Sequence, residues 1–187
     1  MSKSRTLVIV ILSIIALALI GWNLTDSDSE QQKVVASDAP TYQSQHTETL
    51  VYDPTGALQY KLIADNVKYF EAQEDGLFTQ PIMTLFDKEA TATWTVRSNT
   101  AKLTKEKLLY LYGDVKVNSL VPTSQLKTID TDNALVNLIT QDVSSEDEVI
   151  LGGTGFHSNG FKMRGNLREK HAKLIEKVKT TYEIQNQ

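Results

Sequence analysis

The stretch that decides the fold is Leu108-Leu109-Tyr110-Leu111-Tyr112-Gly113-Asp114-Val115-Lys116-Val117, residues 108–117. Its odd-numbered positions are aliphatic except for Gly113, and its even-numbered positions carry mostly tyrosine and charged side chains. Alternation with a period of two is typical of a β-strand that buries one face. The pair Gly113-Asp114 interrupts the alternation, which indicates a bulge or bend within one long strand.

The same alternation recurs on both sides of this stretch, from Thr49 onward, in short runs such as residues 82–86, where Ile82, Thr84 and Phe86 share one face. Turn sequences separate the runs. Asp53-Pro54-Thr55-Gly56 has the residue order of a type I turn, and Asn159-Gly160 is a hairpin signal. About a dozen short strands in about 140 residues predict an all-β fold, an antiparallel two-sheet sandwich or jelly roll.

The last segment, residues 168–184, fits two interpretations. Leu174, Val178 and Tyr182 have helical spacing, and the residues before them are rich in helix-forming types. The same three residues, joined by Ala172, also fit one face of a strand. Because so many strands precede this segment, we expect a strand here.

An uncharged apolar run occupies residues 7–24. As a helix it would be about 27 Å long, close to the thickness of a bilayer core, so it predicts a transmembrane helix. Lys3 and Arg5 precede the run and acidic residues follow it, so the positive-inside rule places residues 1–6 in the cytoplasm and the rest across the membrane. A cleaved signal peptide is the alternative, because Ala16-Leu17-Ala18 has the form that a signal peptidase recognises. The apolar run continues well beyond this site, which favours an uncleaved anchor.

Charge is distributed unevenly along the rest of the chain. Residues 25–44 are polar and predict a linker, which leaves residues 45–187 as one domain. Residues 26–161 carry a net charge of −10, and residues 162–187 carry +4. This asymmetry suggests that the C-terminal end meets a partner or an anionic ligand, although an ordinary solvated face would look the same. An acidic domain outside the cytoplasm is not suited to binding nucleic acid.

No pattern in the sequence indicates an enzyme. The three histidines, His46, His157 and His171, lack the close spacing of a metal-binding pair, and no Gly-x-Ser-x-Gly motif is present. Residues 152–155 are glycine-rich but lack the lysine of a phosphate-binding loop, so they predict a turn. We expect no metal or cofactor. Two functions stay open: a carrier with an apolar interior, or an adaptor that joins partners through exposed sheet edges.

Several motifs together carry a resemblance to a known family. They are Pro40-Thr41-Tyr42, Thr49-Leu50-Val51-Tyr52-Asp53-Pro54, Gly56-Ala57-Leu58, Phe78-Thr79-Gln80-Pro81, Leu109-Tyr110-Leu111-Tyr112-Gly113, Thr131-Asp132-Asn133-Ala134, Lys162-Met163-Arg164-Gly165-Asn166-Leu167-Arg168 and Tyr182-Glu183-Ile184-Gln185-Asn186. With these motifs the chain resembles the LptC family, the bitopic inner-membrane component of lipopolysaccharide export in Gram-negative bacteria. The resemblance covers nearly the whole chain and weakens mainly in loops, for instance at residues 71–77.

The resemblance implies an open antiparallel β-jelly roll that forms one segment of a periplasmic bridge behind the transmembrane helix. Lipopolysaccharide would be extracted by an inner-membrane ABC transporter, made of two permease subunits with an ATPase dimer, and would pass through the groove of this domain to the soluble bridge protein LptA. The N-terminal edge would dock on the transporter's own periplasmic jelly roll, and the C-terminal edge on LptA.

The resemblance also implies roles for individual residues. Thr47, Phe78 and Thr84 match positions in the lipid groove or at its mouth, and Phe86 is assigned to the same groove. Acyl chains would be held there by apolar burial alone, so the energy for transport must come from the partner ATPase.

Two glycines match positions at which replacement is expected to damage assembly with the transporter, namely Gly56 and Gly153. Each lies in a turn signal, where a Cβ would force a strained backbone or block the close approach of strands. Ala172 and Tyr182 lie in the segment that is expected to meet the bridge protein.

Three cations on one face of a predicted strand, Lys162, Arg164 and Arg168, are candidates for contacts with lipid phosphates or with the acidic edge of a partner.

Overall fold

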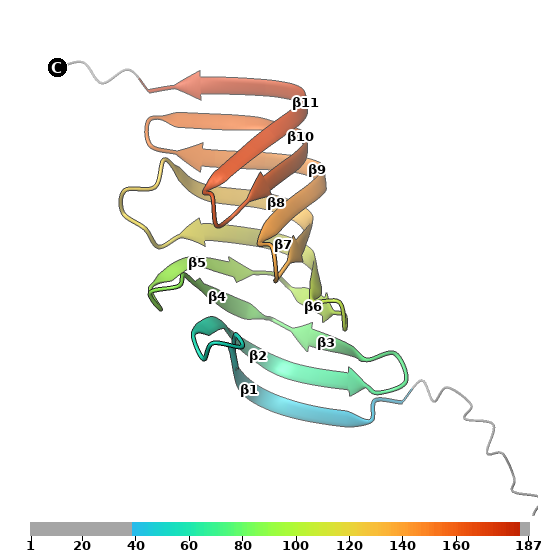
Figure 1. Cartoon of the computed structure of the whole chain (residues 1–187). Coiled ribbons are helices and arrows are strands. Elements are labelled where there is room, and N and C mark those ends of the chain that lie inside the picture. The colour runs from blue at the N-terminus through green and yellow to red at the C-terminus, as the bar shows by residue number, and fades with distance from the viewer. Residues whose placement is uncertain (1–38, 184–187) are drawn as a thin grey trace, which may run out of the picture. The chain divides into compact units, whose positions relative to one another are not determined.

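A computed structural model describes residues 39–183 (Figure 1), and the predicted helix at residues 7–24 lies outside them. The described residues form one sheet of eleven antiparallel strands, so the prediction of an all-β antiparallel fold is confirmed. No helix within this range is long and apolar enough to cross a bilayer. The strands are β1 (Tyr42–Tyr52), β2 (Leu58–Phe70), β3 (Asp75–Thr79), β4 (Ile82–Phe86), β5 (Ala92–Arg97), β6 (Thr100–Leu103), β7 (Leu108–Ser119), β8 (Leu126–Asn137), β9 (Asp142–Gly153), β10 (Phe156–Asn166) and β11 (His171–Tyr182).

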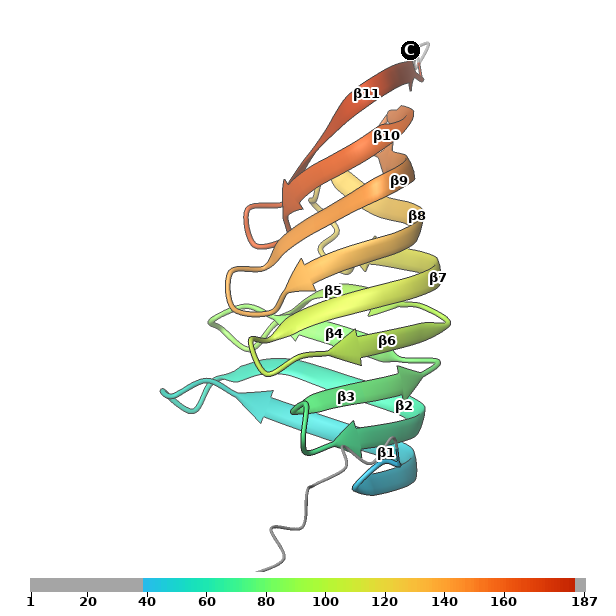
Figure 2. The ribbon, with the colours of Figure 1, turned by 90° about the vertical axis from the view of Figure 1, so that its right-hand side faces the viewer.

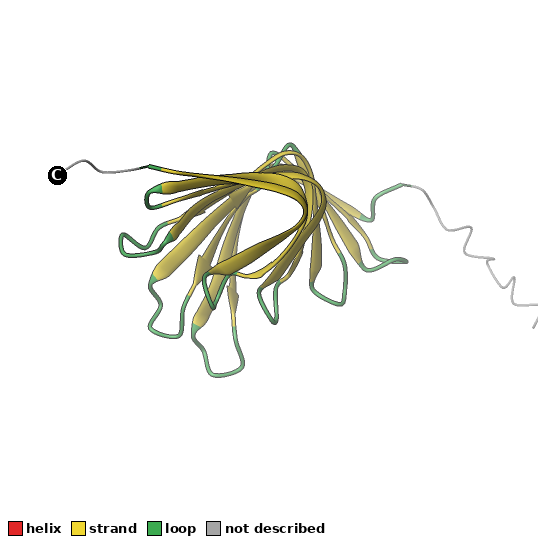
Figure 3. Ribbon diagram, turned by 90° about the horizontal axis from the view of Figure 1, so that it is seen from above, coloured by secondary structure: helices red, strands yellow, loops and turns green. Residues whose placement is uncertain are grey.

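The sheet is folded into two layers, because its long strands pair differently along their two halves. Residues 60–63 of β2 pair with β4, and residues 66–70 pair with β3. In the same way, residues 109–112 of β7 pair with β6, and residues 116–119 pair with β5. We call the layer that contains β4 and β5 layer A, and the layer that contains β3 and β6 layer B. Figures 2 and 3 show the long strands curving from one layer into the other.

The crossing from one layer to the other occurs at backbone irregularities in the long strands. Gly113 and Asp114 of β7 have φ values of 73° and 47°, and the register with β8 shifts between Tyr112 and Val115, which confirms the predicted bulge. Lys162 of β10 has a φ of 58° at another register shift. A bulge bends its strand and increases the local twist. These bends form a corner along one side of the sheet, and the hairpin turns of the two layers face each other across the opposite side, which we call the mouth.

The core lies between the two layers and follows the predicted alternation. The aliphatic side chains on the odd-numbered face of β7, among them Leu109 and Leu111, are 1–2 % exposed. Residues 168–184 contain the strand β11, as the context of the sequence favoured. β1 pairs only with β2 and β11 only with β10, so the described sheet ends in two free edges. β1 begins at Tyr42, inside the segment that the sequence assigned to a linker.

Candidate functional site

The inner face near the N-terminal edge brings together Thr47 and Phe78. Thr47 of β1 pairs with the buried Ala64 of β2, and its hydroxyl is buried with no hydrogen-bond partner among the described residues. Phe78 of β3 pairs with Val67 of β2 and with Ala101 of β6, both of which are buried. β2 therefore lies between the two predicted groove residues, and both face the interior.

A cavity of about 280 Å³ adjoins Phe78 on layer B. Val67, Tyr69 and Leu103 supply most of its apolar lining, and Glu74, Lys105 and Lys107 supply its charged groups. Phe78 is half-buried, so part of its ring remains accessible. The cavity offers apolar surface next to charged groups, which suits a molecule with an apolar and a polar part.

In β4 the buried residues are those that alternate with Thr84. Met83 and Leu85 are 1 % exposed and form the inner face, whereas Ile82 is 47 % exposed and Thr84 pairs with Lys61 on the outer face. Both sets of alternate positions in this strand are largely apolar, so periodicity could not decide which one is buried. Thr84 therefore does not join Thr47 and Phe78 on the inner face.

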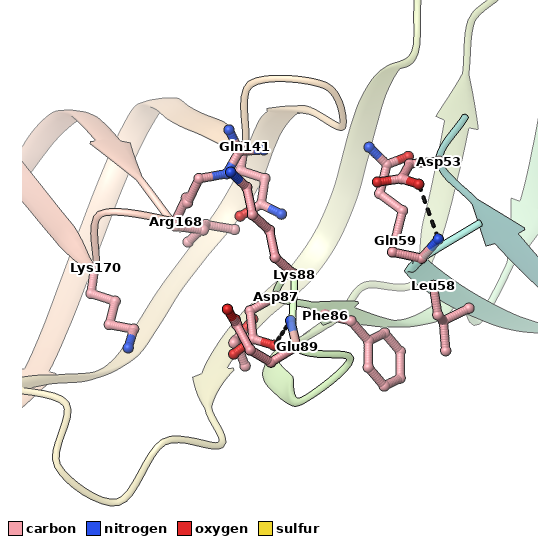
Figure 4. A pocket seen from close by; sticks show the side chains of 13 residues that line it. Asp53, Leu58, Gln59, Phe86, Asp87, Lys88, Glu89, Gln141, Arg168 and Lys170 are labelled. Atoms are coloured by element: carbon pink, nitrogen blue, oxygen red, sulfur yellow. Dashed lines mark hydrogen bonds between the residues drawn. The ribbon is translucent and has the colours of Figure 1, made fainter. Parts of the chain in front are cut away.

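Phe86, at the end of β4, lies in a second cavity of about 350 Å³ at the mouth (Figure 4). We call this cavity the mouth pocket. Residues of both layers form it. Asp53, residues 57–59 and residues 86–89 come from layer A, and Gln141, Leu167, Arg168 and Lys170 come from layer B. Leu58 and Phe86 give it apolar surface, and its charged residues are Asp53, Asp87, Lys88, Glu89, Arg168 and Lys170.

Two of the carboxylates in the mouth pocket are bound within their own turns. Asp53 Oδ1 accepts hydrogen bonds from Thr55 Oγ1 (2.6 Å), Thr55 N (2.8 Å) and Ala57 N (3.0 Å). The bond from the Thr55 hydroxyl, followed by that from the Ala57 amide, lowers the pKa of Asp53 below its ordinary value. Asp87 Oδ1 accepts from the amides of Glu89 (3.1 Å) and Thr91 (2.8 Å) in the equivalent way. These carboxylates shape the turns that form the mouth.

The turn at residues 53–56 also explains the need for Gly56. Gly56 N donates to the carbonyl oxygen of Asp53 at 2.9 Å, as the sequence of a type I turn predicts. Gly56 has a φ of 88°, and a Cβ built there would meet no atom within 4 Å. The glycine is therefore required by its backbone conformation and not by lack of space.

We expect Gly56→Ala to lower the free energy of unfolding by about 1 kcal/mol, because an L-residue is strained at this φ. Gly56→Asn should cost less, since asparagine tolerates the left-handed conformation better than alanine. Urea unfolding of the two variants and the parent protein measures the difference. Equal losses for alanine and asparagine would show that backbone strain is not the cause.

Gly153 is required for a different reason. It is the last residue of β9 and pairs with Phe156, the first residue of β10. A Cβ at Gly153 would overlap the ring of Phe156. Of the two mechanisms that the sequence suggested, strained backbone applies to Gly56 and close approach applies to Gly153.

The C-terminal edge carries an apolar inner face that is open at one side. Ala172 of β11 pairs with Gly165, and Tyr182 pairs with Phe156 and is 72 % exposed. A cavity of about 280 Å³ lies on this face. Its apolar lining comes from Leu126, Leu151, Phe156, Ala172, Leu174 and Val178. The free edge of β11 and this apolar surface together suit addition of a further strand.

The three candidate cations do not form one cluster. Lys162 Nζ lies 2.6 Å from Glu176 Oε1, and this hydrogen bond and the charge of Glu176 raise the pKa of Lys162. Arg164 forms an ion pair with Glu146. Arg168 donates from Nη2 to the carbonyl oxygen of Ile139 at 3.1 Å and lines the mouth pocket. Only Arg168 of the three is therefore placed at the mouth.

The chain is similar to known proteins over nearly its whole length. Residues 8–183 match the family model described as "LptC: Lipopolysaccharide-assembly, LptC-related". The chain is 58 % identical over 186 residues to the lipopolysaccharide export system protein LptC of Escherichia coli K12, which covers 100 % of this chain and 97 % of that protein. It is 37 % identical over 198 residues to the protein of the same name from Haemophilus influenzae, with 95 % of each chain covered. The chain therefore belongs to the LptC family.

Proposed function

We propose that this protein transports lipopolysaccharide from the inner towards the outer membrane as a carrier without catalytic activity. The observation that carries the proposal is the inward-facing Phe78 beside a cavity lined by apolar and charged side chains, with Thr47 on the same inner face of the sheet. The family and the names of its relatives support the same conclusion. Lipopolysaccharide has several acyl chains and a charged headgroup, so its chemistry matches an apolar interior with charged residues at its opening.

The domain has two free edges, β1 and β11, and each can bind a different partner. In this proposal the domain is an open β-jelly roll, β1 docks on the periplasmic jelly roll of an inner-membrane ABC transporter, and β11 docks on the bridge protein LptA. Ala172 and Tyr182 are on β11 and so belong to the LptA side. Residues 7–24 anchor the chain in the inner membrane, with residues 1–6 in the cytoplasm and the domain in the periplasm. Gly56 and Gly153 act on assembly by preserving the shape of the hairpins next to these edges.

Binding in this proposal needs no chemistry. Each acyl methylene buried against Phe78, Phe86 or neighbouring inward side chains contributes about 0.8 kcal/mol. The next groove in the bridge offers similar apolar surface, so transfer is close to neutral and is driven by the ATPase of the transporter. Arg168 is the cation best placed to meet a lipid phosphate, because it lines the mouth, whereas Lys162 and Arg164 pair with glutamates.

A photoreactive amino acid at Phe78 tests the carrier function. We expect it to crosslink lipopolysaccharide when the full chain is reconstituted with the transporter and ATP, because Phe78 faces the interior. The matched control is Leu77, the preceding residue, which lies on the outer face and is 40 % exposed. The same photoreactive group there should give little lipid crosslink.

The alternative function is an adaptor that joins the transporter and LptA through β1 and β11 without holding lipid, and the two free edges favour it. An adaptor would give no ATP-dependent crosslink at Phe78 although the complex assembles. That result would replace the carrier proposal.

A further inference from the structure

The inner face is accessible near its two edges but closed between them. Near the N-terminal edge, Phe78 is half-buried beside a cavity. Near the C-terminal edge, Val178 lines the cavity described above for that edge and is 51 % exposed, and Tyr182 is 72 % exposed. A lipid that enters at one edge and leaves at the other must pass the region between these two sites.

That region is a packed core. Met83 of β4, Trp94 of β5, Leu111 of β7 and Met163 of β10 all belong to one hydrophobic cluster and are 0–2 % exposed. Protein cores of this kind are packed as densely as organic crystals, so they contain no space for an acyl chain. Passage therefore requires these inward side chains to move apart.

One contact joins the two layers at the mouth of this packed region. Trp94 Nε1, on layer A, donates a hydrogen bond of 2.7 Å to the carbonyl oxygen of Leu167, which follows β10 in layer B. Leu167 N in turn donates to the carbonyl oxygen of Gln141 at 2.9 Å, which fixes the turn after β10 to the turn after β8. Leu167 is 1 % exposed and lines the mouth pocket.

The other hydrogen bonds of the mouth turns act within one layer. Thr154 N donates to Gln125 O on layer A, and Leu138 N donates to Lys107 O on layer B, both at 2.9 Å. In the described part of the chain, the Trp94–Leu167 bond is therefore the hydrogen bond that crosses the mouth. Bonds within a layer survive when the two layers move apart, and this bond does not.

We propose that Trp94 is a positioning residue that keeps the middle of the sheet closed, and that lipid reaches the C-terminal half only when the layers separate at the Trp94–Leu167 contact. The inference rests on the carrier function proposed above. Acyl chains that enter the opened core cover the apolar side chains that the separating layers expose, which offsets the cost of opening. The two layers close again after the lipid has passed.

A covalent lock across the mouth tests the proposal. The chain has no cysteine, so Glu89→Cys on layer A and Lys170→Cys on layer B, both of which line the mouth pocket, can be joined with a short, cleavable bismaleimide. The full chain is then reconstituted with the transporter in vesicles containing lipopolysaccharide, without the bridge protein. Photoreactive groups at Phe78 and, in a parallel preparation, at Val178 report where the lipid is.

We expect the lock to leave the ATP-dependent lipid crosslink at Phe78 unchanged and to lower the crosslink at Val178 at least tenfold, with recovery after cleavage of the linker. The control pair is Asp75→Cys on β3 and Lys102→Cys on β6, whose parent side chains form an ion pair of 2.6 Å within layer B and line none of the cavities described above. Joining this pair does not bridge the mouth, so labelling at Val178 should persist.

Equal labelling at Val178 in the locked protein and in the control pair would overturn the proposal while leaving the carrier function intact. Loss of the Phe78 crosslink in the unlocked protein would instead refute the carrier function, and the gate with it. The two failures are therefore distinguishable.

Trp94→Phe supplies a second measurement, because it keeps an aromatic ring in the core but removes the indole N–H. Hydrogen exchange at the Leu167 amide should become about fivefold faster, which corresponds to the loss of one net hydrogen bond. Lipid should also appear sooner at Val178, an effect that a purely structural role for Trp94 would not produce. Unchanged exchange and unchanged lipid arrival would contradict the role of this bond.

Discussion

Gly153→Val is expected to lower the free energy of unfolding by about 2–3 kcal/mol, the upper part of the range found for overpacking of a site that has no spare volume. The new side chain would occupy the position of the Phe156 ring, which packs directly on Gly153 across the β9–β10 hairpin. Phe156 also lines the C-terminal cavity, so its displacement would fill space that the carrier function leaves open for lipid. The substitution should therefore impair transport beyond its effect on stability.

A double-mutant cycle isolates this cause. In a Phe156→Ala background the space around residue 153 is free, so adding Gly153→Val should cost less than about 1 kcal/mol. Thermal or urea unfolding of the four proteins measures the coupling. If Gly153→Val is equally destabilising in both backgrounds, the overlap with the ring is not its cause, and the backbone at this position must be responsible.

Much of the fold could be predicted because it depends on local patterns. The odd-numbered aliphatic residues of β7 are buried, the bulge lies at Gly113-Asp114, and the turn at Asp53 closes as its residue order predicts. In each case the deciding information lies within about ten neighbouring residues, which is the range over which periodicity and turn chemistry act. The ambiguous segment at residues 168–184 was decided correctly only by the context of the strands before it.

Which face of β4 is buried could not be predicted, because both of its faces are largely apolar. Ile82, Met83, Leu85 and Phe86 are all apolar, so either set of alternate residues could have been buried. Pairing with β2 decides the matter, since Leu85 lies opposite the buried Tyr60, and Thr84 lies opposite Lys61 on the outer face. The signal was therefore in the partner strand and not in β4 itself.

The mouth pocket and the Trp94–Leu167 hydrogen bond could not be predicted from the sequence for a related reason. The residues that line the mouth pocket are spread along the chain from Asp53 to Lys170. The Trp94–Leu167 hydrogen bond joins residues that are 73 positions apart. The sequence identified Arg168 and Phe86 as candidates but had no means to place them in one cavity with Leu58 and Lys88. Contacts of this kind depend on which turns of the two layers come to face each other, which no local pattern encodes.

Trp94→Ala is expected to have the largest effect on stability of any single change discussed, about 4 kcal/mol. Trp94 is fully buried at 0 % exposure, so its truncation leaves a large cavity between the layers. It also leaves the Leu167 carbonyl oxygen without the indole donor. The two losses fall on the same contact, so the variant should weaken the packed middle of the sheet more than either edge.

Comparison with two other variants separates these contributions. Trp94→Phe keeps most of the volume and loses the hydrogen bond, so its cost should be about 1–2 kcal/mol and well below that of alanine. Leu77→Ala, on the outer face, should cost less than about 1 kcal/mol, because that side chain is already 40 % exposed. Urea unfolding followed by circular dichroism gives all three values. If Trp94→Phe is as costly as Trp94→Ala, the hydrogen bond and not the filled volume dominates, and the layers are held together mainly at the mouth.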